Sequence, residues 1–409
     1  MTARIDPELL KTYADVVLRC GVNVEQGQKV LLMGAVEHSD LLGTLAERAY
    51  AHGASVAYVH YFDDRIDRAQ LVNAPDDEQA GRLAPWFAQM MDVAIEERWA
   101  RVRTYGDSSD DPFSGAAMRR VSALQSAQSE QVLRYINAGM NWCVCPCPTP
   151  GWAERVYGEP DVERLWRDLS HMARLDEPDP IAAWETQHGK LARRAAQLNE
   201  AAFSSLRFVG GRTDLTVTLH PQCAWQSAWQ TTPGGRPYVC NLPTEEVFAA
   251  PDFRGVTGTA AATRPIEVNG VLVEGLELRF EQGRIVEVRA AANAEAVRAQ
   301  IEEDEGAARL GEVALVDGSS RIGRLGTVFK DTLLDENAAC HIAWGDSADE
   351  HPAEDPEDDV ARGVNRSRIH EDAMIGGPEV SVFGVTAGGD EVPVIVADEW
   401  RLPDAEALH

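Results

Sequence analysis

Basic residues are scarce in this chain, and long apolar runs are missing from it. The 409 residues include 38 Lys and Arg against 66 Asp and Glu, which gives a formal net charge of −28. Nucleic-acid binding needs clustered Lys and Arg, so we expect no nucleic-acid partner. No apolar run approaches the ~20 residues that cross a bilayer, and the N-terminus lacks the apolar segment of a signal peptide. We therefore expect a cytoplasmic protein without a membrane partner.

The cysteines lack the spacing of a typical zinc site. Seven are present, an odd number in a chain without a secretion signal, so we expect free thiols. Three of them alternate in "WCVCPCPTPGW", at Cys143, Cys145 and Cys147, and a strand would place them on one face. No second pair accompanies them, and small buried cysteines are common in cores. We interpret them as core residues.

The first half of the chain has the pattern of an α/β domain. "KVLLMGA" (29–35), the helical "SDLLGTLAERAYAHGA" (39–54) and "SVAYVHY" (55–61) predict a strand–helix–strand unit of a parallel sheet. No G-x-G-x-x-G motif or P-loop follows the first strand, so no nucleotide site is indicated. Further helices are predicted over 78–100, 115–138 and most of 151–207. We predict an α/β N-terminal domain with a partly parallel sheet over 1–195.

From residue 206 the period changes from helical to extended. "TDLTVTL" alternates, and Asn269-Gly270 and Gln282-Gly283 separate β-rich runs, which is a strong hairpin signal. A helix is predicted over 292–304 and a strand over 310–316, and the acidic segment 346–359 is expected to be a solvated loop. We predict an α+β C-terminal domain over 196–409, rich in antiparallel sheet.

Three residues of the second half suit a metal site by their residue type. In "SRIHEDAMIGG", His370 and Asp372 are two positions apart, so their side chains share one face of a strand. His341 lies in the apolar stretch "DENAACHIAWG". Taken alone, His341 is more simply a hydrogen-bonded core histidine, and the His370 and Asp372 pair more simply decorates the end of a strand.

Carboxylates in apolar surroundings add to these candidates. Glu245 and Glu246 lie in "NLPTEEVFAAP", and Glu312 begins the apolar strand in "RLGEVALVDG", where a carboxylate needs a partner. Singly, each is more simply a surface group at a strand end. Two imidazoles and three carboxylates together suit one or two divalent ions, but composition does not show that they converge.

Four motifs occur in order that resemble those of the thermophilic aminopeptidase family, the aminopeptidase T and aminopeptidase S group: "NLPTEEVFAAPD", "GEVALVD", "LLDENAACHIAWG" and "IHEDAMIGG". The resemblance implies that the C-terminal domain is catalytic and that one or two divalent ions (Mn, Zn, Co or Fe) bind five residues, namely Glu246, Glu312, His341, His370 and Asp372. We expect Glu246 or Glu245 to move a proton of the attacking water. The family also implies a homo-oligomer that acts on a small-molecule substrate.

One position departs from the family pattern. The family carries a tyrosine seven residues after the first histidine, where this chain has Ala348, and no tyrosine follows Tyr238. Losing one oxyanion donor typically costs roughly 3–4 kcal/mol. We therefore interpret the chain as an aminohydrolase that resembles 5-nitroanthranilate aminohydrolase. Such an enzyme releases ammonia from a small amino-aromatic acid by attack of metal-bound hydroxide, and the ring itself spreads the developing charge.

Three other functions stay open at this point. A conventional metallo-aminopeptidase would remove N-terminal residues from peptides. An Fe(II) ring-cleaving dioxygenase would need only two histidines and one carboxylate, and it would have no use for Glu246 and Glu312. A non-catalytic binding protein is the third.

Substrate-binding residues are the least specific part of the prediction. Arg321 and Arg324 in "SSRIGRLG" are candidates for holding a substrate carboxylate. His351 is a candidate to replace the missing tyrosine. Each is more often an exposed loop residue.

Overall fold

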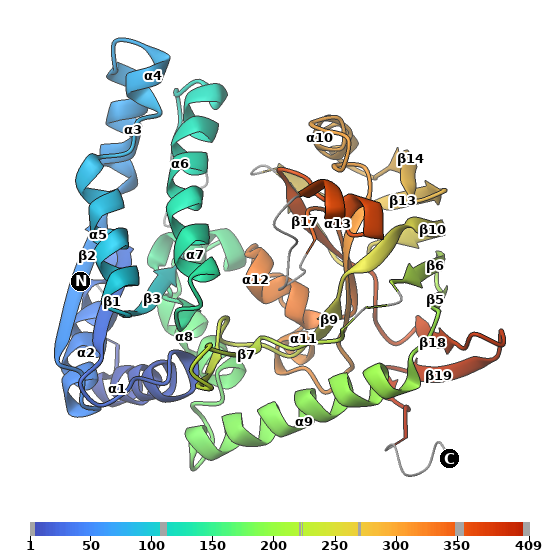
Figure 1. Cartoon of the computed structure of the whole chain (residues 1–409), viewed down its shortest axis with the longest axis horizontal. Helices are drawn as coiled ribbons and strands as arrows, with labels where there is room; N and C mark the ends of the chain where they lie inside the picture. Colours follow the sequence, from blue (N-terminus) through green and yellow to red (C-terminus); the bar gives the residue numbers. More distant parts are fainter. Residues whose placement is uncertain are drawn as a thin grey trace. The chain divides into compact units, whose positions relative to one another are not determined.

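The computed structural model describes residues 5–106, 113–220, 222, 224–268, 271–347 and 356–403. The chain divides into two compact units, Met1–Thr186 with Ala228–Pro243, and Gln187–Ser227 with Thr244–His409. Figure 1 colours the first unit mainly blue to green and the second mainly green to red. The boundary predicted between 195 and 196 falls within helix α9 (Pro180–Ala201).

The first unit is an α/β domain, as predicted. Its main sheet has four described strands in the order β2-β1-β3-β4, and all neighbours in it are parallel. The strands are β1 (Lys29–Ala35), β2 (Val56–Phe62), β3 (Ala100–Tyr105) and β4 (Trp142–Pro146). Helix α2 (Ser39–Ala51) joins β1 to β2, which confirms the predicted strand–helix–strand unit. The single helix predicted over 78–100 is wrong: the range contains α4 (Asp77–Ala80) and α5 (Pro85–Glu96), since Pro85 begins a new helix, and Ala100 already belongs to β3.

Helices surround this sheet. The first begins at Pro7, where the side chain of Asp6 caps the helix by accepting a hydrogen bond from the Glu8 backbone N–H. The described helices are α1 (Pro7–Val16), η1 (Val17–Gly21), η2 (Val36–His38), α3 (Asp64–Asn73), α4 (Asp77–Ala80), α5 (Pro85–Glu96), α6 (Met118–Asn137), α7 (Pro150–Tyr157) and α8 (Val162–Met172). A hairpin of β7 (Trp229–Thr231) and β8 (Pro237–Val239) belongs to the same unit.

The three alternating cysteines of the first unit are core residues, as interpreted from their spacing. Cys143 and Cys145 lie on β4, and both are fully buried, with Cys147 just beyond the strand. Burial raises the pKa of Cys145 to about 12, so this group is a neutral thiol at physiological pH.

The second unit contains two antiparallel sheets. Among the described residues, an eight-stranded sheet has the order β14-β13-β10-β6-β5-β18-β19-β20, and a four-stranded sheet has the order β17-β16-β15-β9. The larger sheet consists of β5 (Ser205–Gly210), β6 (Thr213–Leu219), β10 (Pro251–Ala261), β13 (Glu277–Glu281), β14 (Arg284–Arg289), β18 (Ser381–Val385), β19 (Glu391–Val396) and β20 (Glu399–Trp400). The smaller sheet consists of β9 (Val247–Ala249), β15 (Leu310–Leu315), β16 (His341–Gly345) and β17 (His370–Met374). One hydrophobic core joins the two sheets.

Short elements complete this unit. They are β11 (Ile266–Val268), β12 (Val271–Val273), α10 (Ala294–Gln300), α11 (Arg321–Leu325), α12 (Thr332–Asp335), η3 (Glu336–Ala338) and α13 (Pro356–Arg362). Strands β11 and β12 pair antiparallel, as the Asn-Gly signal predicts, although residues 269–270 themselves lie outside the described part. The antiparallel-rich α+β prediction is confirmed. No described helix has the length and apolar character needed to cross a membrane.

The composition of the acidic segment 346–359 predicted a solvated loop. This prediction is wrong for the last residues of the segment, which are helical. Residues 348–355 lie outside the described part, but α13 follows them and contains Asp359, which is fully buried. Arg362 and Arg366 both donate hydrogen bonds to its carboxylate. Two guanidinium groups compensate the burial of this charge, a pairing that sequence composition does not reveal.

Candidate metal centre

Four of the predicted ligands lie on one face of the smaller sheet. Glu312 of β15 and Asp372 of β17 both lie opposite Ala343 of the strand between them, β16. His341 precedes Ala343 by two residues and His370 precedes Asp372 by two, so all four side chains point to the same side. Ala343 occupies little space at the centre, which leaves room between the carboxylates.

The other face of the same strands belongs to the core. Val313, Ile342 and Trp344 alternate with the cluster residues, and each is fully buried in the core that both sheets share. The fifth predicted ligand, Glu246, directly precedes β9, which pairs with β15. The smaller sheet therefore has one apolar face, which packs in the core, and one face rich in carboxylates.

Gly311 places Glu312 on the cluster face. The register of β15 against β16 shifts between Leu310, which lies in the core, and Glu312, which lies opposite Ala343. In a regular strand these two side chains would share a face, so a β-bulge at Gly311 redirects the second one. A Cβ atom on Gly311 would lie 1.9 Å from the backbone oxygen of Asp346, so only glycine fits here.

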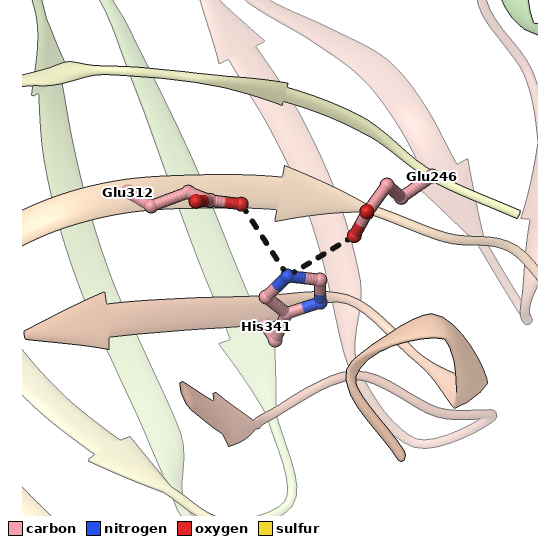
Figure 2. Close-up of side chains that lie close together, drawn as sticks. All are labelled: Glu246, Glu312 and His341. Atoms are coloured by element: carbon pink, nitrogen blue, oxygen red, sulfur yellow. Dashed lines mark ion pairs between the residues drawn. The ribbon is translucent and has the colours of Figure 1, made fainter. Parts of the chain in front are cut away.

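His341 lies at the centre of the cluster. Its Nε2 is 3.3 Å from Oε2 of Glu246, 3.5 Å from Oε1 of Glu312 and 3.9 Å from Oδ1 of Asp372. Figure 2 shows the first two carboxylates approaching this nitrogen from different directions. Nε2 of His370 is 3.7 Å from one oxygen of Glu312 and one of Asp372. Ligands ~2.0–2.2 Å from one ion lie at roughly such spacings from each other.

Two buried carboxylate oxygens of this cluster accept no hydrogen bond from the described residues. His341 is 1% exposed, Asp372 4%, Glu246 6% and Glu312 7%. Within the described structure, Oε2 of Glu246 and Oδ1 of Asp372 take part in no hydrogen bond. A buried carboxylate oxygen without a partner is costly. The residues present therefore fit a divalent cation, which would bind these oxygens.

Both imidazoles are oriented for metal binding. Nδ1 of His341 lies 3.2 Å from the backbone oxygen of Ala339, and Nδ1 of His370 lies 2.9 Å from that of Asp346. A carbonyl oxygen only accepts, so Nδ1 carries the proton in each neutral ring. The lone pair of each Nε2 then faces the carboxylates, as ligand histidines require.

The electrostatics of the cluster favour bound protons when no cation is present. Burial opposes charge on His341, but Glu312, Glu246 and Asp372 outweigh it and raise the pKa of this imidazole to about 9. At His370 burial is likewise outweighed, chiefly by Asp372, and the pKa rises to about 10. Burial, together with Glu312 and Asp372, raises the pKa of Glu246 to about 8. A divalent cation must displace these protons.

Glu336 is a cluster residue that sequence reasoning missed. It lies in η3 and is 9% exposed, and its Oε1 accepts a hydrogen bond from Nδ2 of Asn337 at 3.3 Å. Burial raises its pKa well above the usual range, and the neighbouring carboxylates of Glu246 and Asp372 raise it further. The available signal was an acid in the apolar stretch "LLDENAAC".

The carboxylate of Glu245 has partners of a different kind. Its Oε2 accepts a hydrogen bond from Gln187 at 2.8 Å and lies 3.8 Å from Nζ of Lys190, and its Oε1 accepts one from the Arg321 backbone N–H at 3.4 Å. These partners belong to α9 and α11. Adjacent glutamates in the sequence therefore have separate surroundings.

The predicted substrate residues are not brought to the cluster by any described contact. Arg324 donates from Nε to the backbone oxygen of Gly318 at 2.9 Å. It lines a cavity of about 580 Å³, and the described lining of that cavity includes none of the five predicted ligands. Arg321 begins α11 beside Glu245. His351 and Ala348 lie outside the described residues.

The second unit has the buried imidazole–carboxylate cluster of a metal-binding site, and comparison with known proteins assigns the chain to the class of metal-dependent hydrolases. Residues 6–400 match the family model described as thermophilic metalloprotease (M29). The chain is 40% identical to aminopeptidase T of Thermus aquaticus, over 97% of this chain and 99% of that protein. It is 34% identical to aminopeptidase PepS of Streptococcus thermophilus, over 97% and 98% of the two chains.

A solved structure extends the likeness to the fold. Wild-type AmpT from Thermus thermophilus superposes with a TM-score of 0.88 at 38% identity, and the match covers 96% of this chain and 99% of that one. This chain belongs to the thermophilic metalloprotease family, which confirms the resemblance found in its motifs. Divalent metal ions are the cofactors of such an enzyme.

Replacing Gly311 by alanine is expected to weaken metal binding by about 10–100-fold. The added methyl group collides with the backbone oxygen of Asp346, which also accepts from Nδ1 of His370, so two ligands are displaced together. Competition with a chelating dye measures the affinity. Gly189→Ala, at a helical glycine with open space around its Cβ position, is the control. Equal affinity of G311A and the unchanged protein would contradict the role of the bulge.

Metal binding is expected to release protons and to strengthen as pH rises. At pH 7 the two imidazoles, with pKa values of about 9 and 10, and Glu246, with a pKa of about 8, hold protons in the metal-free protein. Raised pKa values mean that protons compete with the metal, so affinity falls as pH drops from about 9 to 6. Calorimetric titration with a divalent metal in two buffers of different ionisation enthalpy counts the released protons. Binding without net proton release would contradict the prediction.

Proposed function

We propose that this chain is a metallo-aminopeptidase that removes N-terminal residues from peptides. The observation that carries the proposal is the buried cluster of Glu246, Glu312 and His341, whose ligand atoms all lie within 4.8 Å of one another. Full-length likeness to proteins named aminopeptidase T and PepS supports the same substrate class. This activity was one of the alternatives left open by the sequence.

We propose the five metal ligands that the motif resemblance implies, namely Glu246, Glu312, His341, His370 and Asp372. One or two divalent ions held there would polarise the scissile carbonyl and lower the pKa of a water molecule. The backbone carbonyls of Ala339 and Asp346 orient the two imidazoles for this task. Whether Mn, Zn, Co or Fe occupies the site depends on availability as well as on the ligands.

A carboxylate beside the metal ligands is proposed to move the proton of the attacking water. The sequence pointed to Glu246 or Glu245. The neighbourhood of Glu336 adds a third candidate, because this buried carboxyl group lies beside Glu246 and Asp372. Glu245 is held by a glutamine and a lysine, which favours a positioning role for it.

The aminohydrolase favoured by sequence reasoning is the second candidate function. It rests on one residue, Ala348, at the position of the family tyrosine, and on the lack of any tyrosine after Tyr238. The relatives, all named aminopeptidases, support peptide hydrolysis instead. A dioxygenase is disfavoured, since Glu246 and Glu312 lie within 3.5 Å of the His341 Nε2. A cytoplasmic location and a homo-oligomeric state stay predictions.

Metal-loaded protein is expected to release free leucine from the tripeptide Leu-Gly-Gly and to leave its N-acetylated form intact. Ammonia release from 5-nitroanthranilate is expected at the background level. Both products are measured in the same preparation, with a chelator abolishing leucine release and added metal restoring it. Ammonia without leucine would overturn the aminopeptidase in favour of the aminohydrolase. Cleavage of the acetylated peptide would exclude strict aminopeptidase action.

Glutamine substitutions identify the proton carrier. Glu336→Gln is expected to lower kcat by about 10²–10⁴-fold while bound metal stays near its normal content, because general acid–base catalysis typically contributes that much. Glu245→Gln, with its partners Gln187 and Lys190, is the matched control and is expected to lower kcat less. Metal content by mass spectrometry separates a lost proton carrier from a lost ligand. The opposite order of the two effects would assign the task to Glu245, one of the two glutamates that the sequence suggested.

A further inference from the structure

Asn337 is a fully buried amide next to the candidate proton carrier Glu336. Both residues lie in η3 of the second unit, and Asn337 is 0% exposed. An amide side chain has one acceptor oxygen and a nitrogen that donates, and burying either of them without a partner is costly. The contacts of Asn337 therefore show which groups it holds in place.

The amide oxygen of Asn337 holds the segment that contains a proposed metal ligand. Its Oδ1 accepts a hydrogen bond of 2.7 Å from the backbone N–H of Glu245, which directly precedes Glu246. The two bonded residues are 92 positions apart in the chain, and both are buried. This hydrogen bond therefore fixes the segment before β9 against η3.

The amide nitrogen of Asn337 holds the carboxyl group of Glu336. Nδ2 donates to Oε1 of Glu336 at 3.3 Å and to the backbone oxygen of Leu333 at 3.1 Å. Because a carbonyl oxygen only accepts and a backbone N–H only donates, Leu333 and Glu245 together fix which end of the amide faces Glu336. An aspartate carboxylate at this position would keep the acceptor and lose the donor.

Proposed metal ligands contact or closely approach the same carboxyl group. A side-chain hydrogen bond links Glu336 to Asp372, and the charges of Glu246 and Asp372 are the strongest that act on Glu336. The carboxyl group of Glu336 is therefore held both by the Asn337 amide and by a residue of the proposed metal site.

The backbone of Asn337 is fixed as well. Oγ of Ser320 donates to the backbone oxygen of Asn337 at 2.7 Å and accepts from the backbone N–H of Gly323 at 3.0 Å, as the cap of α11. Ser320 is fully buried. Hydrogen bonds of this kind keep a functional side chain in its productive geometry.

We propose that Asn337 is the positioning residue for proton transfer, which holds the carboxyl group of Glu336 at the metal ligands and ties it to the segment of Glu246. The proposal rests on the proposed peptidase function and adds a residue that acts through Glu336 rather than on the substrate. Replacing Asn337 is therefore expected to affect catalysis only while Glu336 is present.

A double-mutant cycle on Leu-Gly-Gly hydrolysis tests this dependence. Asn337→Asp keeps an oxygen for the N–H of Glu245 and removes the donor to Glu336, and it is expected to lower kcat by about 10–100-fold with KM nearly unchanged. In the Glu336→Gln background the same change is expected to lower kcat by less than about twofold. A merely structural role would lower kcat by the same factor in both backgrounds, which would overturn the proposal.

Metal affinity, measured by competition with a chelating dye, tests the second contact without using activity. Asn337→Asp is expected to bind metal no more weakly than the unchanged protein, because the acceptor for the N–H of Glu245 is retained. Asn337→Leu has a similar volume but no acceptor, and it is expected to weaken metal binding by about 10–100-fold. Equal metal affinity of these two variants would contradict the hold on the segment of Glu246.

Asn141→Asp is the matched control. Asn141 is 3% exposed and belongs to the first unit, where its Oδ1 accepts from Gln28 at 2.9 Å and its Nδ2 donates to the backbone oxygen of Val22. This change is expected to leave kcat and metal affinity within about twofold of the unchanged protein. An equal loss of kcat in Asn141→Asp and Asn337→Asp would overturn the proposal.

Two further measurements keep the outcomes separate. Thermal melting shows whether each variant folds, and Asn337→Ser, which also removes the donor to Glu336, replaces Asn337→Asp in the cycle if the latter does not fold. Failure of the proposed function would appear as absent leucine release by the unchanged protein, and it would remove proton transfer as the role of Asn337. Failure of the present proposal alone would leave that release intact.

Discussion

The crowding of carboxylates around one buried imidazole is the constraint on which the second unit depends. Three carboxylate oxygens lie between 3.3 and 3.9 Å from Nε2 of His341, and His341 is almost fully buried. The ligand oxygens of Glu246 and Glu312 lie within 4.8 Å of each other. Like charges this close repel strongly where water is excluded, so the arrangement is tolerable only with protons or a divalent cation among them. Because these buried carboxylates repel one another, a divalent cation that neutralises their charge is stabilised there.

A rigid sheet is the means by which the chain holds these groups against their repulsion. Residues of one face belong to the core shared with the eight-stranded sheet, as Ile342 and Trp344 do, and the ligands alternate with them on the other face. Packing that fixes the strands therefore fixes the ligands as well. The bulge at Gly311 interrupts the regular pairing of β15 with β16, and it transfers Glu312 from the core face to the cluster face.

Several residues of the buried cluster could be selected as candidates from the sequence because their signals are local. The spacing of His370 and Asp372 gave their common face, and the apolar surroundings of His341 and Glu312 marked them as residues in need of a partner. Glu336 was missed, because a single acid in a short helical turn has no distinguishing period. The aminohydrolase interpretation gave one missing tyrosine more weight than motifs that span the chain.

The sequence alone determined the fold class, the strand–helix–strand unit and the family, because hydrophobic period and ordered motifs are properties of contiguous residues. Only the tertiary structure decided which carboxylates meet which partners. Glu245 and Glu246 are neighbours in the chain yet have different partners, and Asn337 and Glu245 are distant in the chain yet share a hydrogen bond. Such differences arise from strand register, a bulge and helix packing, which bring distant residues together and are not encoded at any one position.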